Sequence, residues 1–103
     1  MLTEEQYLFL QLGEECAEVQ QRISKLLRFG RDEIQEEYTE SNIQRLQYEI
    51  YDMLAVLDLL ETRKHLTPKR QERVDHIGRK IDKILRYMAY SQEIGILERK
   101  ELL

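Results

Sequence analysis

The stretch NIQRLQYEIYDMLAVLDLL, residues 42–60, has the apolar spacing of an α-helix. Its apolar side chains recur every three or four positions, which places them along one face at about 100° per residue. These positions are Ile43, Leu46, Ile50, Met53, Leu54, Leu57 and Leu60. Ser41 with Gln44 forms a capping-box pattern just before the stretch, so we expect a helix from there to about residue 63.

A second helix is expected on the N-terminal side of this stretch. Thr3 with Gln6 gives another capping-box pattern, and the apolar spacing that follows predicts a helix over about residues 3–29 that stops near Gly30. The segment 30–40 is polar, and it predicts a connection with at most one helical turn.

A third helix is expected on the C-terminal side. Thr67 followed by Pro68 is a good N-cap with a first-turn proline, and the apolar spacing beyond it predicts a helix to about residue 90. The tail, residues 91–103, predicts a short fourth helical piece. The chain is therefore expected to be all-α, an antiparallel helical bundle of three main helices plus a short C-terminal helical piece, in one domain over residues 1–103.

Assembly is expected to complete this bundle. Three amphipathic helices, one of them apolar on nearly every side, expose more hydrophobic surface than a monomer of 103 residues can hide. Two chains should pack their helices together, which predicts a homodimer or a homotetramer.

The composition limits the function classes. The formal net charge is −4, whereas nucleic-acid binding uses surplus Lys and Arg, so no nucleic-acid partner is expected. The N-terminus MLTEEQ has neither the basic start nor the apolar run of a signal peptide, and Cys16 is the only cysteine. The longest apolar stretch, residues 53–60, is far shorter than the roughly 20 residues of a membrane span. We therefore expect a cytoplasmic protein with no membrane partner.

Two pairs of acids lie along the edges of the apolar stripes. Glu15 with Glu18 and Glu49 with Asp52 are each separated by three residues, and Asp52 is followed by an apolar turn of helix. A buried carboxylate costs several kcal/mol without compensation, and these acids would crowd one another between antiparallel helices. A divalent metal ion is the economical compensation for these charges.

The ligand types favour magnesium. All-oxygen ligands suit Mg²⁺, with Mn²⁺ as a possible substitute. A di-iron bundle would need Glu-x-x-His motifs, and neither His65 nor His76 lies three residues after a Glu. One cysteine and two distant histidines give no zinc spacing.

A structural explanation competes with the metal site. In a chain rich in Glu, one Glu-x-x-Glu pair on a helix is usually a solvated face, and Arg22 and Lys25 would be ordinary ion-pair partners of Glu18. Two such pairs on consecutive helices favour the site. The alternative is a non-catalytic helical dimer, a regulatory or interaction module in which the acids form an interface network.

The same residues resemble a known family. EECAEVQQRISKLLRFG (14–30), followed by residues 42–60, is similar to the MazG-like all-alpha nucleoside triphosphate pyrophosphohydrolases, whose signature is Glu-x-x-Glu, a spacer and Glu-x-x-Asp. The tail RYMAYSQEIGIL (86–97) resembles the C-terminal part of short single-domain members.

The resemblance implies Mg²⁺-dependent hydrolysis of a (deoxy)nucleoside triphosphate to the monophosphate and pyrophosphate. It implies four magnesium ligands, Glu15, Glu18, Glu49 and Asp52, with Glu15 or Glu18 as the catalytic base. The residues expected to bind the substrate are Arg22, Lys25, Arg28, Asn42, Lys83, Arg86 and Tyr90. A degenerate member that binds nucleotide without cleaving it is the intermediate alternative.

Overall fold

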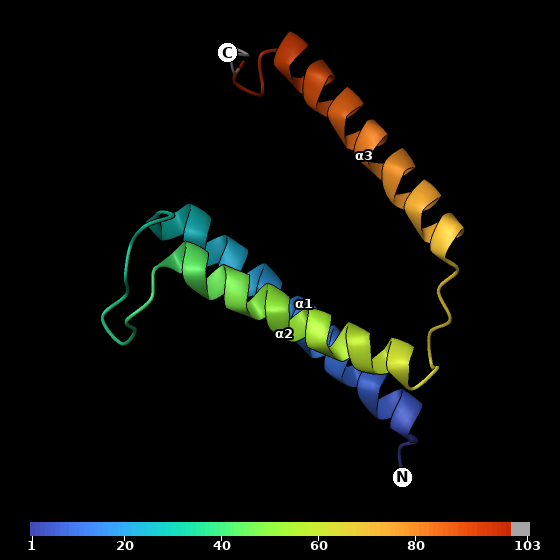
Figure 1. Cartoon of the computed structure of the whole chain (residues 1–103). Helices are drawn as coiled ribbons and strands as arrows, with labels where there is room; N and C mark the ends of the chain where they lie inside the picture. The colour runs from blue at the N-terminus through green and yellow to red at the C-terminus, as the bar shows by residue number, and fades with distance from the viewer. Residues whose placement is uncertain (100–103) are drawn as a thin grey trace. The chain divides into compact units, whose positions relative to one another are not determined.

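The computed structural model describes residues 1–99 and contains three α-helices and no strand in that range. They are α1 (Glu4–Phe29), α2 (Asn42–Thr62) and α3 (Arg70–Glu93) (Figure 1). The expected all-α class is therefore confirmed. The chain divides into two units, Met1–Thr67 and Pro68–Leu103, so α1 and α2 form one unit and α3 belongs to the other.

The first two helices begin where their capping boxes predict. At α1, Thr3 Oγ1 accepts from the Gln6 backbone N–H at 3.1 Å, and the Gln6 side chain accepts from the Thr3 N–H at 3.0 Å. Ser41 and Gln44 make the same reciprocal pair at α2. Each box satisfies N–H groups that have no partner within the helix. Gly30 ends α1 at φ 107°, a conformation that glycine adopts without strain.

The α1–α2 unit is an antiparallel hairpin, in which the two helices lie side by side (Figure 1). Val56 and Leu60 of α2 are its buried apolar side chains among the described residues. At the middle of the hairpin, Cys16 Sγ lies 3.8 Å from Met53 Sδ. At the open end, Glu4 Oε1 lies 3.0 Å from His65 Nε2 and 3.6 Å from Arg63 Nε. These contacts fix the register that places the acids of α1 opposite those of α2.

One side of α2 stays uncovered. The sequence makes this helix apolar nearly all round, which predicts burial, but Tyr51, Leu54 and Leu59 are 45–53% exposed. A single neighbouring helix covers one face only. Of the residues one turn beyond Asp52, Val56 is buried whereas Ala55 and Leu59 are exposed, so the expected burial is met on only one side of α2 in the single chain.

The third helix differs from its prediction at both ends. Thr67 and Pro68 precede the helix, which begins at Arg70 with Lys69 as an N-cap that makes no side-chain capping bond. The helix continues to Glu93, beyond the expected end at residue 90. Residues 94–99 form a turn rather than a fourth helical piece, and the rest of that prediction, residues 100–103, lies outside the described residues.

The helices of the described range 1–99 include none with both the length and the apolar character of a membrane span.

Candidate functional site

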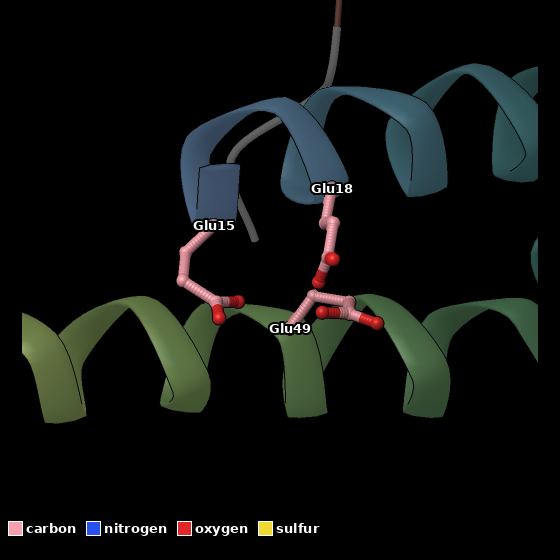
Figure 2. Close-up of side chains that lie close together, drawn as sticks. All are labelled: Glu15, Glu18 and Glu49. Carbon is pink, nitrogen blue, oxygen red and sulfur yellow. The ribbon is translucent and has the colours of Figure 1, made fainter. Parts of the chain in front are cut away.

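Three glutamates converge at the middle of the α1–α2 hairpin. Glu15 and Glu18 extend from α1 towards α2, where they meet Glu49 (Figure 2). One carboxylate oxygen from each residue lies within 4.8 Å of the others. The convergence follows from the sequence, since positions three apart share a helix face and the antiparallel register brings Glu49 opposite that face. We call Glu15, Glu18 and Glu49 the three-acid cluster.

The cluster contains carboxylate oxygens without partners. Glu15 Oε1 accepts a hydrogen bond from Gln11 Nε2 at 2.9 Å, but Glu15 Oε2 and Glu49 Oε2 are buried and accept none. Within the part of the chain that the structure describes, no Lys or Arg forms an ion pair with the three acids within 4.0 Å. Buried carboxylate oxygens normally have a donor or a cation beside them. In the hairpin, these two carboxylate oxygens have neither a donor nor a cation beside them.

The crowding of carboxyl groups in the cluster raises the pKa of Glu18. A hydrogen bond that its protonated carboxyl donates to Glu49 raises the pKa of Glu18, and the charges of Glu49 and Asp52 and partial desolvation act in the same direction. A hydrogen bond with Glu15 opposes this rise in pKa. The cluster therefore holds a proton more tightly than an isolated glutamate does, as expected for like charges that share a site.

The donor set fits a hard divalent cation. Six oxygens placed about 2.1 Å from Mg²⁺ are separated from one another by about 3 to 4.2 Å, so the cluster, whose oxygens lie within 4.8 Å of one another, would contract around the ion. The buried, unpartnered oxygens of Glu15 and Glu49 would gain a cation. The residues present are therefore compatible with the magnesium site that the sequence predicts.

Asp52, the fourth expected ligand, is not part of this cluster. Its side chain is exposed, although its charge contributes to the raised pKa of Glu18 and it lies on α2 one turn from Glu49. The structure thus brings three of the four expected ligands together. The participation of Asp52 stays a prediction.

The residues expected to bind substrate are divided between the two units. On α1, Arg22 is buried, Lys25 is half-buried, and exposed Arg28 donates to Ser24 Oγ at 3.4 Å. Asn42, at the start of α2, is 1% exposed and donates its amide to the Gly30 carbonyl at 2.8 Å. The Asn42 amide thus holds the loop in this conformation.

The other three residues expected to bind substrate are on α3. Lys83, Arg86 and Tyr90 line one shallow groove on that helix together with Tyr87, whose ring centroid lies 6.0 Å from Lys83 Nζ. They belong to the second unit, Pro68–Leu103. Their contact with the substrate stays a prediction.

Arg45 and Tyr38 also lie near the cluster and were not expected there from the sequence. Arg45 lies on α2, one turn before Glu49, and its guanidinium carbon is 3.3 Å from the centroid of the Tyr38 ring. The spacing of Arg45 to Glu49 mirrors that of Glu18 to Arg22. In an antiparallel hairpin such mirrored spacings meet on one side, and this signal was available in the sequence.

The chain matches no family model, no curated protein and no solved structure.

The metal-free protein should show an unusual pH dependence. Because the pKa of Glu18 is raised on folding, its contribution to stability is fully present below the ordinary value of 4.5 and is lost as the pH rises through the raised pKa. We expect Glu18→Gln, measured in EDTA, to become progressively more stable than wild type as the pH is raised from about 4 to 7. Thermal melts across that range test this, with exposed Glu14→Gln as the control. A difference in Tm that does not change with pH would contradict the prediction.

Proposed function

We propose that this chain is a Mg²⁺-dependent nucleoside triphosphate pyrophosphohydrolase that converts a (deoxy)nucleoside triphosphate to the monophosphate and pyrophosphate. The observation that carries the proposal is the three-acid cluster, three carboxylates within 4.8 Å with two buried oxygens that lack partners. A cation would compensate these oxygens, and a magnesium site held by a few carboxylates typically completes its shell with water and substrate phosphates. The family resemblance of the two helices supports the same reaction.

Each residue of the cluster has a distinct place in this proposal. Glu15 and Glu49 would hold the metal through the oxygens that are buried and unpartnered, and Asp52 would join them from the next turn of α2. When bound, Mg²⁺ supplies neutralisation of the phosphate oxygens and activation of water. Glu18 is the exposed acid of the cluster, so it is the better candidate to take the proton of a water molecule that arrives from solvent.

Cationic residues of α1 are proposed to bind the triphosphate. Arg22 lies one turn from Glu18, and Lys25 and Arg28 follow on α1. Nucleoside triphosphates are found in the cell interior, so we propose a cytoplasmic protein.

The second candidate is a helical interaction protein that binds no metal. The exposed apolar side chains of α3 favour it, since such a face is typical of helices that bind a partner. The same face would also serve the assembly of an enzyme, so only activity and metal binding separate the two functions.

The first test is metal and nucleotide linkage. Because only the folded hairpin brings the three acids together, millimolar Mg²⁺ or Mn²⁺ should raise the Tm, and a triphosphate should raise it further by mass action. Pyrophosphate release from the common NTPs and dNTPs, measured with and without Mg²⁺, then identifies the substrate. If neither ion nor any nucleotide moves the melting curve and no pyrophosphate is released, the enzyme proposal fails.

A further inference from the structure

Two arginines meet over one tyrosine near the loop end of the α1–α2 hairpin. The guanidinium carbons of Arg22 and Arg45 lie 5.3 and 3.3 Å from the centroid of the Tyr38 ring. Tyr38 belongs to the connecting segment, residues 30–41. Each arginine lies four residues from a glutamate of the three-acid cluster, about 6 Å along its helix. A cationic pair therefore adjoins the acidic cluster on its loop side.

The charges of this pair are poorly compensated. Arg22 is 6% exposed, and its Nη1 is buried without a hydrogen-bond partner, as is Nε of Arg45. Across residues 1–99 no carboxylate lies within 4.0 Å of Arg22, and Arg45 reaches Glu40 only at 4.0 Å. The face of Tyr38 attracts both cations but accepts no conventional hydrogen bond from them. A buried guanidinium group such as that of Arg22 is costly without a carboxylate partner, so an anion is expected to bind here.

The base of the connecting segment is held firmly. Asn42 donates its side-chain amide to the Gly30 carbonyl at 2.8 Å and its backbone N–H to the Glu33 carbonyl at 2.9 Å. The Ile43 N–H donates to the Arg31 carbonyl at 3.0 Å. These bonds join the two ends of the segment and do not involve Tyr38, so a displacement of the Tyr38 side chain would not require α1 or α2 to open.

The chemistry of the pair favours a phosphate group. Guanidinium forks donate two parallel hydrogen bonds to a phosphate, and two neighbouring cations are best compensated by an anion with more than one charge. An acidic cluster one helical turn away would hold a metal ion, and that ion would remove its repulsion of a polyphosphate. Metal and arginines together match a chain of phosphates rather than a single carboxylate.

We propose that Arg22 and Arg45 form a binding subsite for the pyrophosphate part of a triphosphate, and that Tyr38 covers this subsite in the structure described here. The identity of the anion rests on the proposed function, whereas the subsite itself rests on buried Arg22 and half-buried Arg45, which meet over Tyr38. The subsite binds the phosphates that leave as pyrophosphate. It stabilises their charge during cleavage of the bond to the α-phosphate.

The binding test compares variants of three arginines in the first unit. Inorganic tripolyphosphate and pyrophosphate are titrated into the full chain by calorimetry in the presence of Mg²⁺. We expect Arg45→Gln to weaken binding at least about tenfold, as the loss of a charge-assisted fork would. Arg22→Lys should weaken it because the ammonium cannot replace the fork. Arg63→Gln at the opposite end of the hairpin, where Arg63 pairs with Glu4, should bind as wild type does. Equal affinity for Arg45→Gln and wild type would overturn the subsite.

Fluorescence tests whether Tyr38 covers the subsite. The chain contains no Trp, so Tyr38→Trp introduces a single reporter beside Arg45. Tripolyphosphate should change its emission, and the change should vanish when Arg45→Gln is added. Tyr7→Trp, an exposed position on α1, should not respond. Binding by calorimetry with no change in the emission of Tyr38→Trp would overturn the role of Tyr38 as a cover.

Kinetics separate this inference from the proposed function. If the chain cleaves a nucleotide but Arg45→Gln leaves KM and product inhibition by pyrophosphate unchanged, the subsite is wrong and the enzyme assignment stands. If tripolyphosphate binding depends on Arg45 but no nucleotide is cleaved, the anion subsite stands and the enzyme assignment falls.

Discussion

Glu49→Gln is expected to abolish pyrophosphate release and to leave the metal-free protein at least as stable as wild type. Glu49 provides a buried carboxylate oxygen without a partner, so its neutral amide replacement removes a charge from the proposed metal site. Loss of a ligand should cost more than the roughly 10- to 100-fold that outer-shell partners of a metal cost, so we expect a decrease in activity of more than about 100-fold. The pyrophosphate-release assay measures this directly.

The expected effect of Glu49→Gln on stability is opposite to its expected effect on activity. The hydrogen bond and the charge of Glu49 are the two largest causes of the raised pKa of Glu18, so like-charge crowding is present in the absence of metal. Glu49→Gln relieves it, and urea unfolding in EDTA should show an unchanged or higher free energy of unfolding. Exposed Glu14→Gln on α1 is the matched control, with activity and stability close to wild type. Asp52→Asn tests the fourth expected ligand in the same assays.

The interaction-protein alternative makes the reverse prediction. If Glu49 forms an interface ion pair with another chain, its neutralisation leaves a buried partner charge and should destabilise the assembly by about 3–5 kcal/mol. That destabilisation, together with unchanged binding of Mg²⁺, would contradict the enzyme proposal. Activity and unfolding therefore have to be measured on the same preparation.

Local rules predicted the first two helices well. The capping boxes at Thr3 and Ser41 form as the sequence indicates, because each depends on only four consecutive residues. The predicted start of α3 was two residues too early. Thr67 followed by Pro68 is an acceptable N-cap sequence, but the structure uses Lys69 without a side-chain bond. A weak local preference of this kind is easily outweighed by its surroundings.

The candidate site was predictable as far as helix geometry determines it. Glu15 and Glu18 share a face of one helix, and any antiparallel partner with a flanking acid would meet them there. The contact of Arg22 and Arg45 with Tyr38 was not predictable in this way. It depends on the path of the segment 30–41, which long-range hydrogen bonds of Asn42 fix, and a pattern of apolar spacing contains no information about them.

A second large effect, on assembly, is expected from substitutions on the apolar face of α3. Its apolar side chains lie on one face and are 44–56% exposed in the single chain. They are Val74, Ile77, Ile81, Ile84, Leu85 and Met88. In the hairpin, among residues 1–67, the buried apolar side chains are only Val56 and Leu60. So small a core provides little apolar burial to stabilise a monomer, and we propose that a second copy of the chain covers these faces. Light scattering at micromolar concentration should give at least twice the chain mass of 12.5 kDa.

Ile81→Lys should disrupt that assembly. A lysine at the centre of the apolar face would place an unpaired charge in the interface, at a cost of several kcal/mol, on the order of the whole stability of a small domain. We expect the mass to fall to that of a monomer and the Tm to decrease strongly. His76→Lys adds the same charge on the other side of α3 and should retain both the mass and the Tm. If Ile81→Lys keeps the wild-type mass, the apolar face of α3 does not mediate assembly. A monomeric mass for the wild type would contradict the assembly itself.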